Sequence, residues 1–255
     1  MQSDEIFGAI LEAVESYGAD GNCLLTFSNV QCEEARIIHD RLCDPSNNLE
    51  SRRFKFSFDS LSKTITVVLP EGIKAEPCGW LVSVFFITWA RLVPAANFDV
   101  FQLLSETHKD FGYPYIGTIK EADSAIWLDE SHWPFIVMEV GWSESLSRLR
   151  LNRDIWLQGS GGAVRVVIIV KFTRGETGVR GSLEISCQRD GEITRQTKSI
   201  WPITEEEDPY ILLGDLYGSS LPEGYDGNIK LPLCLSLLRS RCKGRLKNIG
   251  LIPAE

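Results

Sequence analysis

Residues 120–172 read KEADSAIWLDESHWPFIVMEVGWSESLSRLRLNRDIWLQGSGGAVRVVIIVKF, and the fold class follows from them. Two short apolar runs in this segment, Ala125–Leu128 and Phe135–Val140, are separated by the connection DESHW. Short apolar runs on either side of such a connection are typical of adjacent antiparallel strands. The segment therefore predicts a β-hairpin at its beginning.

A helix and a further strand follow this hairpin. Residues 143–157 carry apolar side chains at helical spacing, and residues 164–172 are almost continuously apolar, as in a strand buried on both faces. The glycine-rich residues 159–162 follow the helix and do not open one, so they predict a helix end and not a phosphate cradle. Strand, helix and strand make a right-handed βαβ unit with a parallel pair. We expect an α/β fold of the α+β kind, a mixed sheet flanked by helices in which the hairpin feeds the βαβ unit.

The rest of the chain adds elements on both sides of this segment. The further expected elements are helices at 3–17, 29–43, 80–92, 100–108 and 234–246, and hairpins at 54–69 and 182–200. No repeat or low-complexity linker separates them, so we expect a single domain, 1–255. Its core would span about 53–216, with an N-terminal helical extension at 1–45 and a C-terminal basic tail or helix at 217–255.

Composition narrows the class of protein. The chain has 255 residues, enough to bury a full core, and a net charge of −9 at pH 7. No apolar run reaches the roughly 18 residues of a membrane span, so no membrane partner is expected. The N-terminus lacks a basic region followed by an apolar stretch, and the seven cysteines lack CxxC or CxxH spacing. These features predict an intracellular protein, cytoplasmic or nuclear, with reduced thiols.

Positive charge gathers in two places despite the acidic total. One cluster comprises Arg148, Arg150 and Arg153, and the second runs from Arg239 to Lys247. An acidic chain does not favour indiscriminate nucleic-acid binding, but local arginine clusters can contact phosphates. The alternative is that both clusters are solvated faces with no ligand.

Two carboxylates interrupt the apolar hairpin. If its turn is centred near Glu130 and Ser131, Asp123 lies opposite Glu139, with Cβ atoms roughly 4.5–5.5 Å apart. Facing carboxylates repel each other unless a positive charge lies between them. A divalent ion bound by one or two carboxylates, water and phosphate would supply that charge. The alternative is that Glu139 pairs with an arginine such as Arg150, while Asp123 only caps a strand end.

The same residues carry a resemblance to a known family. The segments ADSAIWL, PFIVMEVGWSES, LRLNRDIWL, GSGG and VRVVIIVKF follow one another in the chain. In this order they resemble the strand, strand, helix, turn and strand of the Uma2-like branch of the restriction-endonuclease-like, or PD-(D/E)XK, superfamily. The resemblance is best over residues 113–172 and is closest to fungal-type members. It implies a restriction-endonuclease-like domain that hydrolyses nucleic-acid phosphodiester bonds with a divalent metal.

The resemblance also implies roles for individual acids. Asp123 falls on the family's strand aspartate and Glu139 on its metal-binding glutamate. Mg²⁺ or Mn²⁺ is therefore the implied cofactor. The fold usually has a further acid on a preceding helix, for which Glu76 is the nearest candidate.

The family's catalytic lysine is missing from both of its usual positions. The position two residues after the glutamate is Gly141, and the alternative position on the following helix is Asn152. In the family this lysine orients the attacking water and offsets charge on the phosphate. Lys171, Arg153 and Lys120 are the residues that could replace it.

A serine hydrolase is a poor fit to the chain. The letters GWSES at 141–145 resemble a nucleophile elbow, but the last residue is not glycine. All three histidines precede this serine, whereas the elbow family places its histidine after the nucleophile.

Two functions from different classes remain open. The first is a metal-dependent nuclease with Asp123, Glu139, Lys171 and Arg153 as its catalytic residues. The second is a catalytically inactive nuclease-fold module that binds nucleic acid or a protein partner, as the missing lysine and the acidic net charge suggest. The expected partner is nucleic acid, DNA in preference to RNA, and homodimerisation is left open. The residues expected to contact nucleic acid are Arg148, Arg150, Arg241, Lys243 and Arg245.

Overall fold

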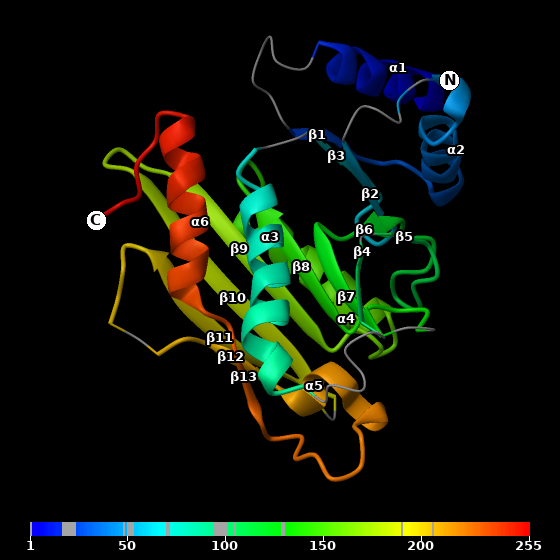
Figure 1. The fold of residues 1–255 in the computed structure, drawn as a ribbon. Helices are drawn as coiled ribbons and strands as arrows, with labels where there is room; N and C mark the ends of the chain where they lie inside the picture. The colour runs from blue at the N-terminus through cyan, green and yellow to red at the C-terminus, as the bar shows by residue number, and fades with distance from the viewer. Residues whose placement is uncertain are drawn as a thin grey trace. The chain divides into compact units, whose positions relative to one another are not determined.

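The chain divides into two compact units, labelled by element in Figure 1. The computed structural model describes residues 2–16, 24–47, 49, 54–69, 72–93, 101–104, 106–128, 131–189, 191–205 and 207–255. The first unit comprises Met1–Glu71 and Glu106–Glu121, and the second comprises Gly72–Ser105 and Ala122–Glu255. Glu130, at the centre of the predicted turn, lies outside the described residues.

The first unit is a small antiparallel sheet with two helices. Its main strands pair in the order β1-β3-β2, and a backbone bridge from Phe58 to Ile119 links β2 to the short pair of β5 and β6. Ile10, Ile38 and Phe58 are fully buried in its core. The elements are α1 Gln2–Glu15, β1 Leu24–Phe27, α2 Cys32–Leu42, β2 Lys55–Asp59, β3 Thr64–Val68, β5 Thr107–His108 and β6 Lys120–Glu121. The hairpin expected at 54–69 is therefore confirmed, and it belongs to this unit.

The second unit is built on a six-stranded mixed sheet. The strands lie in the order β11-β10-β9-β8-β7-β4, and only β8 and β9 are parallel among these neighbours. Helix α4, Leu146–Gly159, connects these two strands. The strands are β4 Phe101–Leu104, β7 Ser124–Leu128, β8 Ile136–Gly141, β9 Val166–Arg174, β10 Val179–Arg189 and β11 Glu192–Trp201. The predicted fold class is confirmed: a mixed sheet flanked by helices, with an antiparallel hairpin feeding a βαβ unit.

The register of the β7–β8 hairpin determines which side chains share a face. Ser124 pairs with Met138 and Ile126 with Ile136, which is the register that the sequence predicts. Successive side chains of a strand point to opposite faces. Ile136 and Met138 belong to the main hydrophobic core of this unit. Glu139 therefore points to the other face of the sheet.

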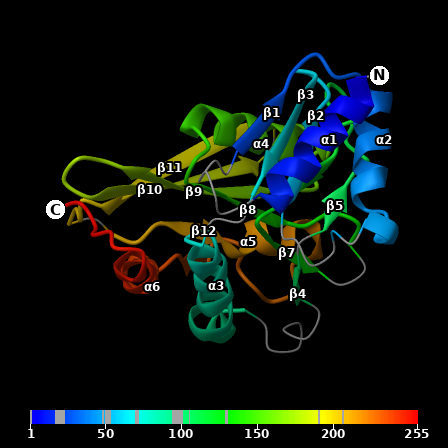
Figure 2. The same ribbon diagram turned by 90° about the horizontal axis from the view of Figure 1, so that it is seen from above.

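Helices cover both faces of this sheet. Figures 1 and 2 show α3 and α6 on one face and α4 on the other. The α3 helix, Ala75–Ser83, continues through a π-helical turn at Val84–Thr88 and a 3₁₀ turn at Trp89–Arg91, and α6 spans Leu235–Asn248. The helix predicted at 80–92 thus begins earlier than expected, because a proline in the first turn of a helix is tolerated.

Two buried tryptophans connect the α3 segment to β13, Lys230–Pro232, and to the start of α6. The indole N–H groups of Trp80 and Trp89 donate to the carbonyl oxygens of Cys234 and Pro232, each at 2.8 Å. Both rings are fully buried in the main core. A buried indole needs such a partner for its N–H, so these bonds fix where the two segments meet.

One expected helix is wrong. The segment predicted as helix at 100–108 contains β4 at Phe101–Leu104 and β5 at Thr107–His108. Strand β4 pairs antiparallel with β7 and forms one edge of the sheet. Ladder hydrogen bonds to the otherwise open edge of β7 outweigh the weak helical pattern of this segment.

The C-terminal part of the second unit adds a short antiparallel pair. β12, Tyr210–Leu212, pairs with β13, Lys230–Pro232, and α5, Leu213–Tyr217, follows β12 directly. Within the described ranges, no helix is both long enough and apolar enough to cross a membrane.

Candidate functional site

Asp123 lies immediately before β7 and closes the end of the β7–β8 ladder. Its backbone N–H donates to the carbonyl oxygen of Met138 at 3.0 Å. Its carboxylate Oδ2 accepts a hydrogen bond from the backbone N–H of Val140 at 2.6 Å. Charge-assisted hydrogen bonds of this kind are among the stronger ones in proteins. The geometry agrees with the alternative in which Asp123 caps a strand end.

Glu139 lies within β8 and is 0% exposed. Its Oε1 accepts a hydrogen bond of 2.7 Å from the indole N–H of Trp156 on α4. Trp156 is also fully buried, and the ring of Trp133 meets it edge-on with centroids 6.5 Å apart. Burying a carboxylate is costly unless it is hydrogen-bonded, and the indole N–H offsets part of that cost.

The two acids thus belong to the same hairpin segment but are held by different parts of the unit. Asp123 is bound by the backbone of β8, whereas Glu139 is bound by α4. Over the described ranges, no group of three or more His, Cys, Asp or Glu side chains is placed to hold a metal ion. An ion held by two carboxylates needs further ligands from water and phosphate, which require an open path. The full burial of Glu139 does not fit that requirement, and the Mg²⁺ or Mn²⁺ site stays a prediction.

The packing of α4 against β8 leaves no room for a lysine side chain at Gly141. A Cβ atom at Gly141 would lie 2.6 Å from Cδ1 of Leu149, and the side chain of Leu149 is fully buried. Protein interiors are too closely packed for that leucine to give way without strain. The second position, Asn152, is only 4% exposed. A long cationic side chain has no room at Gly141 while α4 is packed in this way.

Lys171 lies beside Gly141, the position at which the resembled family has a lysine. The parallel register of β8 and β9 pairs Gly141 with Lys171. Register partners project to the same face, so Lys171 lies on the face of the sheet that Glu139 faces. Its Nζ donates to the carbonyl oxygen of Trp142 at 2.7 Å. The third candidate, Lys120, lies in β6 of the first unit and is 1% exposed.

The arginines of α4 bind a buried glutamate that our reading of the sequence missed. Glu184 on β10 is 2% exposed, and its Oε2 accepts from Nε and Nη2 of Arg150 at 3.0 and 2.7 Å. Nη1 of Arg153 donates to Oε1 at 3.1 Å, and Arg195 of β11 adds an ion pair at 3.3 Å. Arg150 is therefore paired with this acid and not with the acid of β8. The sequence marks Glu184 only as the one charged residue in the strand segment SLEISC.

The second basic cluster lies on α6, where Arg241 faces α3 and Arg245 faces the turn just before α3. The guanidinium groups of Arg241 and Arg245 occupy the space that Cβ atoms at Gly79 and Gly72 would take. The Nε atoms of both arginines are buried. Lys243 lies between them in the sequence and is exposed. Arg241 and Arg245 thus pack α6 on α3 and on the turn just before it, and Lys243 is the member of this trio that faces solvent.

Glu76 and Arg148 also have structural neighbours. Burial, and then the charge of Glu76, raise the pKa of the Cys242 thiol on α6 to about 12. The backbone N–H of Arg148 donates to Oγ of Ser145, the N-cap residue of α4, at 3.2 Å. This bond satisfies one of the free N–H groups at the start of the helix.

A further ion pair lies at the carboxyl end of β8. Nζ of Lys74, immediately before α3, donates to Oε2 of Glu144 at 3.1 Å, and the side chains are 13% and 4% exposed. Glu144 follows β8 in the turn before α4. We did not select either residue from the sequence, because they are 70 residues apart and no local pattern joins them. The pair holds the start of α3 against the turn that leads into α4.

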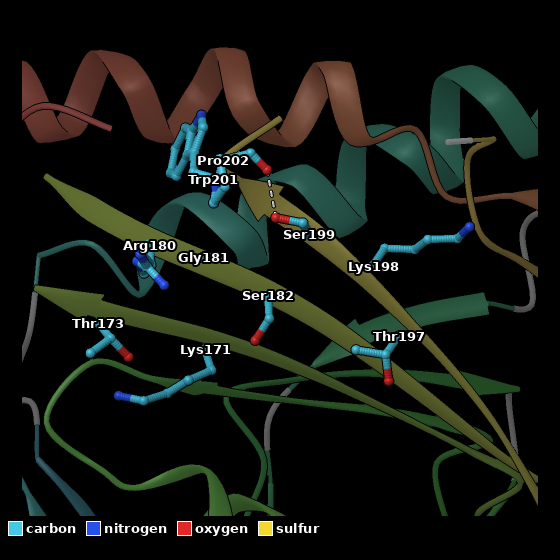
Figure 3. A pocket seen from close by; sticks show the side chains of 10 residues that line it. All are labelled: Lys171, Thr173, Arg180, Gly181, Ser182, Thr197, Lys198, Ser199, Trp201 and Pro202. Carbon is cyan, nitrogen blue, oxygen red and sulfur yellow. Dashed lines mark hydrogen bonds between the residues drawn. The ribbon is translucent and has the colours of Figure 1, made fainter. Parts of the chain in front are cut away.

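The sheet carries an open hollow of about 330 Å³ over β9, β10 and β11 (Figure 3). Its lining includes Lys171, Thr173, Arg180, Ser182, Thr197 and Lys198. In Figure 3, Oγ of Ser199 donates to the carbonyl oxygen of Pro202, a bond of 2.6 Å. Three cations and several hydroxyl groups line this hollow, and its named lining residues include no acid.

Comparison with known proteins identifies no relative of the chain. No family model, no curated protein and no solved structure matches it. The resemblance in sequence to the restriction-endonuclease-like superfamily therefore stays a prediction, and function has to be argued from geometry.

Proposed function

We propose that the second unit is a nucleic-acid-binding module of restriction-endonuclease-like type that lacks a working hydrolytic site. The burial of Glu139 carries this proposal: the side chain is 0% exposed and is hydrogen-bonded to Trp156. In a metal-dependent nuclease this glutamate must reach an ion that also contacts water and phosphate. A carboxylate sealed by a helix does not meet that need.

The lysine positions support the same conclusion. At Gly141 the side chain of Leu149 fills the space that a lysine would need. The arginines of α4 do not substitute for it, since Arg150 and Arg153 are both bound to Glu184. The groups that would perform hydrolysis are thus engaged in holding the unit together.

The hollow on β9–β11 is the surface that fits nucleic acid best. Lys171, Arg180 and Lys198 provide positive charge, and Ser182 and Thr197 provide hydroxyl donors beside them. Lysine, arginine, serine and threonine side chains are among those that contact phosphate oxygens in nucleic-acid complexes. Such contacts depend on backbone charge and not on base sequence, so binding with little sequence preference follows.

Fluorescence anisotropy with labelled duplex DNA and single-stranded RNA tests this proposal. We expect binding that weakens with salt, and a salt slope reduced by about one for each of Lys171→Ala and Arg180→Ala. Arg91→Ala, at an exposed residue of the 3₁₀ turn after α3, serves as the matched control and should leave the affinity unchanged. If Lys243→Ala weakens binding while the hollow variants do not, the C-terminal cluster is the contact surface and the hollow is not. Absence of binding to either nucleic acid at low salt would refute the nucleic-acid-binding module and would favour a module that binds a protein partner.

A nuclease is the second candidate, because one observation favours it. Lys171 pairs in register with Gly141 and lies on the same face of the sheet as Glu139. A lysine is therefore present on the strand next to the position where the resembled family has one. Plasmid DNA and single-stranded RNA incubated with Mg²⁺ or Mn²⁺ provide the test. Cleavage that disappears in both Glu139→Ala and Lys171→Ala would establish the nuclease and refute the binding-only module. Cleavage that survives Glu139→Ala would indicate a contaminant.

A further inference from the structure

A second, larger hollow lies at the opposite end of β9 from Lys171. It encloses about 630 Å³ between the end of α4, the start of β9, the end of β10 and the segment around α5. Arg165 lies immediately before β9, six residues from Lys171, which corresponds to roughly 20 Å along an extended strand. The two hollows are thus separate features of one unit.

Arg165 is held flat on the wall of this hollow. Its guanidinium carbon lies 4.7 Å from the ring centroid of Phe135, a cation–π arrangement. Its other neighbour is Gly218, where a Cβ atom would overlap the guanidinium group. Gly218 has a φ of 55°, a left-handed conformation that also favours glycine. A ring and a bare backbone therefore hold the guanidinium plane in a defined place.

The guanidinium has an unsatisfied donor. Nη1 of Arg165 is buried, and no hydrogen-bond partner for it occurs in the described part of the chain. Burial lowers the pKa of Arg165 from its ordinary value, and the charge of Asp215 acts against that shift. A buried donor without an acceptor is uncommon in folded proteins, and an oxygen atom of a water or of a ligand would satisfy it.

The carboxylate of Asp215 does not provide that partner. Its oxygens accept from Nε and Nη2 of Arg189 at 2.7 and 2.6 Å. The backbone N–H of Leu212 adds a third hydrogen bond to Oδ2 at 2.7 Å. Arg189 and Asp215 neutralise each other, which leaves the charge of Arg165 as the excess positive charge among these three side chains.

An unsatisfied acceptor lies in the same hollow. Oε1 of Gln188, which also lines it, is buried with no hydrogen-bond partner in the described ranges. The residues that line the hollow thus offer one positively charged hydrogen-bond donor, from Arg165, and one amide acceptor, from Gln188. A ligand that satisfies both must carry an anionic oxygen together with a group able to donate, such as a hydroxyl.

Glycines leave the remaining wall open. At Gly161, Gly162 and Gly191 an added Cβ atom would meet nothing within 4 Å, so these residues border open space. Backbone without side chains lets a ligand approach closely. The sequence predicts only a helix end and turn at 159–162, and that role is present, since α4 ends at Gly159. The tertiary fold adds to it by bringing these glycines beside Arg165.

We infer that this hollow binds the phosphate group of a small organic phosphate ester, with Arg165 as the phosphate contact and Gln188 as the contact to a ligand hydroxyl. Guanidinium forms paired hydrogen bonds to phosphate oxygens through its planar fork. A volume of about 630 Å³ is in the range of pockets that enclose ligands of nucleotide size. The inference does not depend on the proposed nucleic-acid surface, which lies at the other end of β9.

Isothermal titration calorimetry of the full chain with adenosine monophosphate, inorganic phosphate, adenosine and citrate tests the inference. We expect saturable binding of the monophosphate, weaker binding of inorganic phosphate and of citrate, and no binding of adenosine. Arg165→Gln should weaken monophosphate binding at least about tenfold, because hydrogen bonds to charged groups contribute about 1.5–3 kcal/mol. The matched control Arg174→Gln, an exposed residue at the far end of β9, should bind as the wild type does.

Two more variants keep the inference testable if Arg165→Gln is unstable. Arg165→Lys retains charge without the planar fork and should bind the monophosphate more weakly than wild type. Gln188→Leu should weaken the monophosphate and leave inorganic phosphate unchanged. The inference is overturned if no phosphate probe binds, if folded Arg165→Gln binds as tightly as wild type, or if adenosine or citrate binds as tightly as the monophosphate.

Discussion

The hydrogen bond between Trp156 and Glu139 can be measured by a double-mutant cycle. The bond is 2.7 Å long, both residues are 0% exposed, and its acceptor is a carboxylate. Trp156→Phe removes the N–H and keeps an aromatic ring, while Glu139→Leu replaces the carboxylate by an apolar side chain. When Trp156→Phe is combined with Glu139→Leu, no buried carboxylate is left to satisfy, so the two changes should not add.

The expected coupling free energy is about 2 kcal/mol, since hydrogen bonds to charged groups contribute about 1.5–3 kcal/mol. In a unit of roughly 150–250 residues this equals a difference of about 4–8 °C in melting temperature. Chemical denaturation followed by circular dichroism supplies the four free energies of unfolding. Trp142→Phe is the matched control, and it should show no coupling to Glu139→Leu. A coupling below about 0.5 kcal/mol for Trp156 would refute the view that Glu139 is held by α4.

Divalent metal offers an independent check on the same site. An ion bound at one hundred times its dissociation constant would stabilise the unit by about 2.7 kcal/mol. If Glu139 is sealed as the structure shows, Mg²⁺ or Mn²⁺ should leave the unfolding free energy unchanged in wild type and in Glu139→Leu alike. Stabilisation by Mn²⁺ that is lost in both Glu139→Leu and Asp123→Ala would favour the nuclease.

Three further outcomes follow from the described contacts. Gly141→Ala places a Cβ atom 2.6 Å from the buried side chain of Leu149, and it should destabilise the second unit by about 1–3 kcal/mol in urea titrations. Burial, and then a neighbouring lysine, lower the pKa of His39, so the unfolded chain takes up the proton first as pH falls. The free energy of unfolding of the first unit should therefore decrease as pH falls through about 6.5, and His39→Gln should flatten that dependence; an unchanged slope would contradict the assignment. Burial raises the pKa values of Cys187 and Cys242 to about 12, so mass spectrometry should find both thiols unalkylated at neutral pH until the chain is unfolded.

Local pattern in the sequence was enough for the central part of the fold. Apolar runs of strand length around DESHW predicted the β7–β8 hairpin, and the register places Ser124 opposite Met138 as expected. The helical spacing of apolar side chains after Gly141 predicted α4, and the continuous apolar run at 164–172 predicted β9. These elements are determined by short-range periodicity, which a single sequence displays directly. Residues 100–108 lacked such periodicity, and their strands depend on partners that are distant in the sequence.

The candidate site depended on contacts that the sequence does not display. Asp123 and Glu139 could be placed on neighbouring strands, but nothing local showed that Trp156 would bind one and the backbone of Val140 the other. The basic clusters were visible as letters, while their partner Glu184 was not distinguished from any other acid in a strand.

The order of strand, strand, helix and strand, and the pairing of the hairpin, are properties of the amino-acid sequence alone. The sequence also shows that a lysine is missing where the resembled family has one. Tertiary packing determines that the side chain of Glu139 is buried and that Leu149 fills the space at Gly141. It also determines that Arg165 and Gln188 line one hollow. The physical reason is range: secondary structure follows from neighbours a few residues apart, whereas burial and hydrogen-bond satisfaction depend on which distant segments meet.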